Sequence, residues 1–385
     1  MFILVLTAIL ALIHLYLWKR LVKDTTVAGR TRWLLTGVLG ALFVVLIAAL
    51  LLPRMIGVTA TRWLAWPGYL WFAVAGYLLL ILLVLEPLRV VLRRRPRREP
   101  TPEHSPVIDR RLFLARGAAA LAGVAAAGVV GAGASRALGD PDLLDVTVRL
   151  RGLHPAMDGF RVAMLSDLHL GPLLGRSFTE RIVRLVNDTE PDLIVIVGDL
   201  VDGEVHELAA ATEPLHALRA AHGTFFATGN HEYYLTDTDA WIEQLDRLGV
   251  RTLRNAHTVI RRGPAAFTLA GVTDVAGARR GDPPDFDRAL SGTDPALPTV
   301  LLAHQPDLIT EAAARGVDLQ LSGHTHGGQV WPFHLAVRAV QPTLAGLAAV
   351  GDTQLYVSRG AGFWGPPARV GAPPDISVLT LRAAG

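Results

Sequence analysis

Cysteine is absent from this 385-residue sequence. Without thiols the chain can form neither a disulfide bond nor a thiolate metal site, so any metal ion must be held by oxygen and nitrogen ligands. Charged residues are also scarce, at 18% of the chain, whereas hydrophobic residues make up 51%. This balance is unusual for a soluble protein and indicates segments that lie in a membrane.

The missing charges are concentrated in long apolar runs near the N-terminus. Three of these runs are long enough, or nearly so, to cross a bilayer. A fourth run, residues 117–134, consists of Ala, Gly, Val and Leu and is less hydrophobic, so it is either a transmembrane or a signal segment. We expect three transmembrane helices within residues 1–92 and the fourth segment within residues 112–137. The three stronger runs are residues 1–18, 33–52 and 64–85.

Basic residues mark the loops between these runs. Residues 19–32 contain five Lys or Arg, residues 53–62 contain two, and residues 93–98 are nearly all Arg. Basic loops stay in the cytoplasm, so we expect a multi-pass protein of the cell membrane whose C-terminal domain is extracytoplasmic. The Arg- and Pro-rich stretch 93–111 is predicted to be a linker. It ends in a motif that is similar to a twin-arginine signal, although its arginines could equally be cytoplasmic loop charges.

The basic charge belongs to the membrane arm alone. Residues 1–137 contain 17 Lys and Arg against 5 Asp and Glu, whereas residues 138–385 contain 20 against 29. A nucleic-acid-binding domain needs clustered basic residues on its folded surface. We therefore expect the membrane as a partner and no nucleic acid, and no obligate protein partner is evident.

Residues 138–385 alternate between predicted strands and helices. Leu193–Gly198 is wholly apolar, as expected for a strand in a sheet covered on both faces. Phe178–Asn187 and Pro214–Ala221 are predicted helices. The pattern is typical of one large α/β domain.

Five of the predicted strands end in polar residues. Each cluster taken singly has an ordinary structural explanation, such as a helix cap, a turn or a packed histidine. Because ligands of α/β sheets bind beyond the carboxyl ends of strands, five clusters at such ends predict one shared site. The clusters are Asp167-Leu168-His169, Gly198-Asp199 with Asp202-Gly203, Gly229-Asn230-His231-Glu232, His304, and Gly323-His324-Thr325-His326-Gly327.

The residue types in these clusters suit metal ions. Asp, His and Asn without thiolate are ligands for Mn²⁺, Fe, Zn²⁺ or Co²⁺. Two ions held about 3.5–4 Å apart need a shared carboxylate, and Asp199 is the natural bridge.

The ordered motifs closely resemble those of the calcineurin-like metallophosphoesterase family. The resemblance covers residues 145–385 and includes Asp-x-His, Gly-Asp-x-x-Asp-Gly, Gly-Asn-His-Glu, a lone His and Gly-His-x-His. The segment Ser166–Gly171 and the turn Gly323–Gln329 look like the bacterial branch that is membrane-anchored or exported by the twin-arginine route. That branch includes enzymes likened to UDP-2,3-diacylglucosamine pyrophosphatases. The resemblance implies a four-layer α/β/β/α sandwich after the all-α transmembrane arm.

The resemblance also implies a role for each polar residue. Asp167, His169 and His326 would hold the first of two divalent ions, and Asp199 would bridge to the second. His231 would be the catalytic histidine, oriented by Asp202. Glu232 stands where many members have Asp. The remaining ligands, those of the second ion, would be Asn230, His304 and His324.

The expected activity is metal-dependent hydrolysis of phosphodiester or pyrophosphate bonds. Two divalent ions would activate a shared water and polarise the phosphoryl oxygens, and His231 would protonate the leaving alkoxide. An inactive membrane-anchored binding module is the alternative from another class. It would lack some ligands, and none is missing.

The substrate is open at this stage beyond a phosphate ester, with a lipid or cell-envelope phosphate as the finer alternative. Residues 331–350 and Phe363–Pro367 are apolar for segments beside a site. They either pack as ordinary core and loop, or form a lip that touches acyl chains or the bilayer. Arg359 either contacts substrate phosphate or forms a surface salt bridge.

Overall fold

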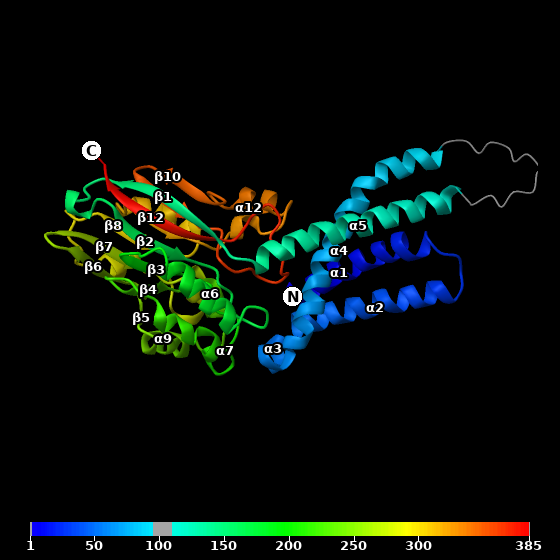
Figure 1. Ribbon diagram of the computed structural model, residues 1–385, viewed down its shortest axis with the longest axis horizontal. Helices are drawn as coiled ribbons and strands as arrows, with labels where there is room; N and C mark the ends of the chain where they lie inside the picture. The colour runs from blue at the N-terminus through cyan, green and yellow to red at the C-terminus, as the bar shows by residue number, and fades with distance from the viewer. Residues whose placement is uncertain (1, 95–109, 385) are drawn as a thin grey trace, which may run out of the picture. The chain divides into compact units, whose positions relative to one another are not determined.

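The computed structural model describes residues 2–94 and 110–384. They form two compact units (Figure 1). One unit comprises residues 1–56 and 60–134, and the other comprises residues 57–59 and 135–385. The predicted linker lies almost entirely outside the described residues, as does Asp109 of the motif that resembles a twin-arginine signal.

The N-terminal unit consists of helices. Four of them are long and apolar enough to cross a membrane, and these candidate spans are Leu4–Lys23, Arg30–Leu51, Val58–Val91 and Leu112–Leu138. The third helix extends well beyond the predicted run 64–85 and contains Pro67 and Pro87. The helices are α1 (Phe2–Leu17), which continues as the π-helix Trp18–Lys23, then α2 (Arg30–Leu51), α3 (Pro53–Ile56), α4 (Val58–Arg94) and α5 (Arg110–Leu138).

Polar side chains within this unit satisfy one another. Arg20 Nε lies 2.7 Å from Glu86 Oε1 and Arg20 Nη1 lies 3.0 Å from Asp24 Oδ2. Trp71 Nε1 donates to His14 Nε2 at 2.9 Å. Buried charges and imidazoles in an apolar bundle require such partners, so these contacts are explained by packing of the helices.

The C-terminal unit contains two six-stranded sheets. Across the first sheet the order is β1 (Asp142–Leu150), β12 (Asp375–Ala383), β2 (Phe160–Leu165), β3 (Leu193–Val197), β4 (Thr224–Ala227) and β5 (Val250–Thr252). Across the second it is β10 (Gly346–Val350), β11 (Thr353–Val357), β9 (Leu319–Ser322), β8 (Thr299–Leu302), β7 (Ala265–Gly271) and β6 (Ala256–Arg262). In the first sheet β2, β3, β4 and β5 are parallel, and β12 pairs antiparallel with β2. In the second sheet β7, β8, β9 and β11 are parallel, and the outer strands β6 and β10 are antiparallel to their neighbours.

Three apolar layers hold the sheets and helices together. Side chains of both sheets, including Phe160 and Phe267, form the central layer. Ile182 of α6 (Arg176–Asn187) and Trp241 of α9 (Thr238–Arg247) cover the outer face of the first sheet. The short helices α10 (Phe286–Leu290) and α11 (Ile309–Ala314) cover the second sheet. The predicted four-layer α/β/β/α sandwich is confirmed.

The structure corrects one predicted helix. Instead of a helix over Pro214–Ala221, α7 occupies Val205–Thr212 and a 3₁₀ turn follows at Glu213–Ala217. Proline lacks the N–H that a helix interior needs, and it stands here at the start of the turn. At the start of α7, the side chain of Glu207 accepts the backbone N–H of Glu204 at 3.2 Å.

The arrangement of the strands brings the predicted clusters to one place. In the first sheet β2, β3 and β4 are parallel, and each is followed within three residues by one cluster. In the second sheet β8 and β9 are parallel, and each is followed within two residues by another. The clusters therefore meet at the carboxyl ends of both sheets.

Candidate metal centre

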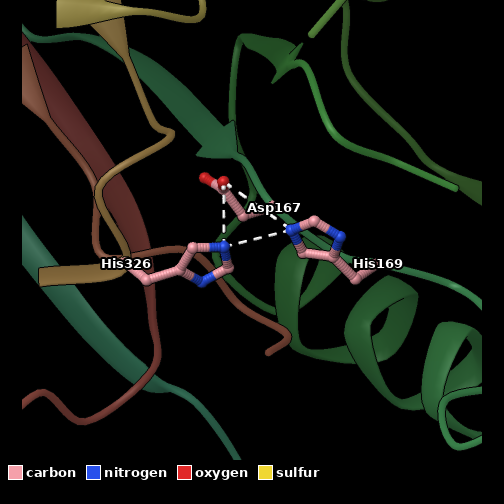
Figure 2. A group of neighbouring side chains, drawn as sticks. All are labelled: Asp167, His169 and His326. Atoms are coloured by element: carbon pink, nitrogen blue, oxygen red, sulfur yellow. Dashed lines mark hydrogen bonds and ion pairs between the residues drawn. The ribbon is translucent and has the colours of Figure 1, made fainter. Parts of the chain in front are cut away.

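Among the described residues, three groups of side chains could hold a cation, and two of them have no residue in common. Asp167, His169 and His326 make up one of these two, and Asp199, His304 and His324 the other. The third group, His169, Asp199 and His231, overlaps both. In each group the potential ligand atoms all lie within 4.8 Å of one another. Figure 2 shows the first group, whose three side chains come from two different sheets and converge.

The first group has the hydrogen bonding of a metal site. Asp202 Oδ1 lies 2.9 Å from His169 Nδ1, and since a carboxylate only accepts, Nδ1 carries the proton. His169 Nε2 then presents its lone pair toward His326 Nε2 at 3.0 Å, and Asp167 Oδ1 lies 3.4 Å from His326 Nε2 (Figure 2). A carboxylate behind a ligating imidazole is the usual outer contact of metal-bound histidine.

The second group also fits a cation, because a hydrogen bond fixes which nitrogen of its histidine faces the centre. His304 Nδ1 lies 2.9 Å from the carbonyl oxygen of Val197, which can only accept, so Nδ1 carries a proton and Nε2 is the nitrogen that faces the centre. Burial alone would lower the pKa of His304, but the carboxylates of Asp199 and Asp167 outweigh it and raise the pKa, so without a metal ion this Nε2 is protonated. That Nε2 is buried and makes no hydrogen bond, although Asp199 Oδ2 lies 3.1 Å away. A lone pair facing a carboxylate oxygen is repelled unless a cation or proton lies between them. The third histidine-side contact of this group is between Asn230 Oδ1 and His324 Nδ1, which lie 2.9 Å apart.

Asp199 faces both groups with one oxygen. Its Oδ2 is 3.1 Å from His304 Nε2 and 3.8 Å from His169 Nε2. Its Oδ1 instead accepts the backbone N–H of His231 at 2.8 Å, which fixes the orientation of the carboxylate. One oxygen is thus available to ions in both groups.

Local backbone strain coincides with the site. Among the described residues, eight that are not glycine have positive φ, and five of these are predicted ligands. Such conformations cost on the order of 1 kcal/mol each and persist only where the surroundings impose them. The sharp turns after the strands bring the side chains inward. The five ligands are Asp167, His169, Asp199, His324 and His326.

Two glycines let neighbouring loops approach the carboxylates. A Cβ on Gly229 would lie 2.2 Å from Asp199 Oδ1, and a Cβ on Gly323 would lie 1.8 Å from Ser166 Oγ and 2.2 Å from Asp167 Oδ2. No larger residue fits these positions without displacing a predicted ligand. The glycines of the motifs therefore make room for the ligands of the adjacent loop.

His231 lies at the accessible side of the site. Its Nδ1 donates to Asp202 Oδ1 at 2.6 Å, and its Nε2 is 3.9 Å from Asp199 Oδ2. Burial alone would lower the pKa of His231, but the carboxylates of Asp199 and Asp202 outweigh it and raise the pKa to about 9. The carboxylate of Asp202 is shared between His169 and His231. Burial alone would raise the pKa of Asp202, but the two imidazoles outweigh burial and lower it.

The imidazoles of the turn after β9 are kept neutral. Burial, followed by the charge of His304, lowers the pKa of His324 to about 4. Burial and the guanidinium of Arg369 lower the pKa of His326. A neutral imidazole is the form that binds a metal ion.

Glu232 has a structural role that its motif does not reveal. The side chain is buried and accepts four backbone N–H groups of two neighbouring loops. Oε1 accepts from Leu200 at 2.8 Å and Val201 at 3.3 Å, while Oε2 accepts from Gly229 at 2.7 Å and Asp199 at 3.0 Å. Glu232 thus holds the Asp199 loop against the Asn230 loop.

Arg369 helps to position the ligand His326, and the sequence motifs do not include it. The side chain is buried, donates from Nη1 to the carbonyl oxygen of His326 at 2.8 Å, and places Nη2 3.1 Å from His326 Nδ1. It also donates to the carbonyl oxygens of Gly360 and Gly362. The available signal was a single arginine within a Gly- and Pro-rich stretch, which is too common to single out.

Arg359, the predicted phosphate contact, pairs with an acid. Its Nε lies 2.7 Å from Asp375 Oδ2, and its backbone N–H donates to the same oxygen at 3.2 Å. This is the salt bridge that the sequence left open as an alternative, although here the partner is buried. Contact with substrate stays a prediction.

The sequence is similar to a known protein family and to several relatives. Residues 160–328 match the calcineurin-like phosphoesterase family. A bovine protein named transmembrane protein with metallophosphoesterase domain is 41% identical over 256 residues, which cover 63% of this chain and 58% of the relative. Its zebrafish (Danio rerio) namesake is 38% identical over 253 residues, with the same coverage. The chain thus spans little more than half the length of these two relatives.

A shorter bacterial relative aligns over nearly its whole length. The uncharacterized metallophosphoesterase YkuE of Bacillus subtilis is 30% identical over 288 residues, which cover 72% of this chain and 98% of that protein. Fold, clustered ligands and sequence agree in defining a metallophosphoesterase domain. The chain belongs to the calcineurin-like metallophosphoesterase family.

Proposed function

We propose that the protein is a membrane-tethered phosphohydrolase with two divalent metal ions, which cleaves phosphodiester or pyrophosphate bonds. The observation that carries this proposal is the position of Asp199 Oδ2 between His169 and His304, at 3.8 and 3.1 Å. A shared carboxylate oxygen between two ligand groups is what a pair of ions requires.

The ligands divide between the two ions as the groups suggest. Asp167, His169 and His326 would hold the first ion, and Asp199 would contribute to both. The chemistry of the donors, carboxylate and imidazole with one amide, suits Mn, Fe, Zn or Co. The second ion would be held by Asn230, His304 and His324.

Such ions would supply activation of water and neutralisation of the phosphoryl charge. The protein's own residues would orient the reacting groups and transfer a proton. His231 is directed at the centre by Asp202 and is partly accessible, so it can deliver a proton from Nε2 to the leaving oxygen. Asp202 holds the tautomer of His169 at the same time, which couples the proton donor to the first ligand group.

The finer substrate assignment is a lipid phosphate, such as that of a UDP-diacylglucosamine. Its support is the exposed apolar surface next to the centre: Trp364 is exposed and its ring lies 6.0 Å from that of His231. An inactive binding module remains the competing function. The complete ligand set and its strained backbone argue against it.

The four apolar helices support a multi-pass anchor, and the charge of the loops supports a catalytic domain outside the cytoplasm. In this arrangement residues 1–92 form three transmembrane helices, 93–111 the basic linker, 112–137 a fourth transmembrane or signal segment and 138–385 the catalytic domain. The alternative for residues 112–137 is a cleaved twin-arginine signal. N-terminal sequencing of the mature protein distinguishes the two.

Activity of the purified full-length protein in detergent tests the function. With Mn²⁺ it should hydrolyse a chromogenic phosphodiester, and His324→Ala should abolish this hydrolysis while thermal unfolding stays cooperative. Glu243→Gln, an exposed change on α9, is the matched control and should keep full activity. Hydrolysis retained by His324→Ala would refute the assignment.

A further inference from the structure

The segment 331–350 directly follows the histidine turn and is largely exposed. Its helix α12 (His334–Val340) buries no residue. Phe333, Leu335 and Val340 are 58%, 61% and 75% exposed, and Trp331 and Leu347 are exposed as well. Ordinary core packing, the alternative that the sequence left open, therefore does not explain these side chains.

The 331–350 segment is fixed to the metal centre at both ends. Near its start, a Cβ on Gly328 would lie 2.3 Å from His334 Cα, so the turn and the helix are in close contact. Near its end, Thr325 Oγ1 donates to the carbonyl oxygen of Leu344 at 2.6 Å. Gln329 Nε2 donates to the carbonyl oxygen of Trp364 at 2.8 Å, which adds a further exposed aromatic ring beside it. The exposed apolar side chains thus belong to a structured projection.

The charge of the segment differs from that of the rest of the domain. Residues 331–350 contain Arg338 and His334 and no Asp or Glu, whereas residues 138–385 as a whole carry nine more acidic than basic residues. Exposed Trp, Phe, Leu and Val with one basic residue and no acid are typical of a surface that enters the headgroup region of an anionic bilayer. Large apolar side chains that are exposed together on one short segment indicate an interaction site.

A bilayer is within reach because of the chain's connectivity. The fourth candidate span ends at Leu138 and β1 begins at Asp142, so only three residues intervene. Fully extended, three residues span about 10 Å. A domain tethered so closely remains at the membrane surface.

We infer that the 331–350 segment is a membrane-docking element, which inserts its apolar side chains into the interface of an anionic phospholipid bilayer. The inference rests on the membrane anchoring proposed above and not on hydrolysis. Docking would place the rim of the metal centre at the level of the lipid headgroups.

The absence of cysteine makes a direct test possible, since one introduced thiol is the only site of labelling. Val340→Cys in the full-length protein is labelled with an environment-sensitive fluorophore and reconstituted into vesicles of phosphatidylcholine and phosphatidylglycerol. Ala296→Cys is the matched control: it is exposed in the loop before β8, at the end of the sheet opposite the centre.

We expect spin-labelled lipids to quench the fluorophore at position 340 and aqueous iodide to lose access to it, with the reverse at position 296. Adding Leu335→Glu should restore access of iodide to position 340 and leave hydrolysis of a soluble phosphodiester unchanged. Equal access of iodide to both positions would overturn the inference. Shielding of position 340 from iodide and lipid alike would also overturn it, because a protein contact would then cover the segment. Because quenching does not depend on turnover, it separates failure of docking from failure of the proposed hydrolysis.

Discussion

Replacing Glu232 with Gln tests how the two loops of the second ligand group are held together. The carboxylate accepts four backbone N–H groups, two on each oxygen, and a glutamine offers only one acceptor oxygen. Its NH₂ group would face two buried donors. Each unsatisfied buried donor costs about 1–3 kcal/mol, so the local loss is about 2–6 kcal/mol.

Hydrogen exchange measured by mass spectrometry reports this loss where it arises. Since each 1.4 kcal/mol corresponds to a factor of ten, a loss of about 2 kcal/mol or more should speed exchange of the amides of residues 199–201 and 229 roughly thirtyfold or more. The exposed change Glu243→Gln on α9 is the control and should leave these amides unaffected. Unchanged exchange at residues 199–201 in Glu232→Gln would refute the reasoning, because the carboxylate would then not be what holds the loops.

Three further substitutions test single contacts. Arg369→Lys removes the planar guanidinium that donates to His326. We expect the affinity for Mn²⁺, measured by titration, to fall about 10- to 100-fold. Unchanged affinity would contradict this positioning role. His231→Gln should lower kcat about 10²- to 10⁴-fold with metal content intact, since only the proton donor is lost; a loss of bound metal in this variant would instead make His231 a ligand. Gly323→Ala places a Cβ against Asp167, and we expect destabilisation of about 1–3 kcal/mol, seen as a lower Tm; a wild-type Tm would show that the loops can separate at no cost.

The sequence was most informative where function depends on short local patterns. Each predicted ligand follows a strand by two to four residues. The periodicity of apolar residues identifies those strands, so both the sheets and the position of their ligands could be predicted. Asp199 could be named as the bridge because two ions need a shared carboxylate. The structure places its Oδ2 near both ligand groups, at 3.1 and 3.8 Å.

What could not be predicted depends on contacts between distant segments. The four N–H groups that Glu232 accepts belong to two separate loops, and Arg369 meets His326 across 43 positions of the chain. The motif identifies the glutamate and not its partners. Strand β1, at the edge of its sheet, is different, because a local pattern marks it. Its apolar residues Leu144, Val146, Val148 and Leu150 alternate with exposed polar residues, which is the period of a half-buried strand.

The central claim is a pair of ions that share Asp199, and the metal content of the purified protein tests it most directly. Elemental analysis of the full-length protein, loaded with Mn²⁺ and freed of excess metal, should give two ions per chain. His304→Ala should retain one and Asp199→Ala should lose tight binding of both, because the bridge serves each ion. A wild-type content of one ion, unchanged in His304→Ala, would contradict the account.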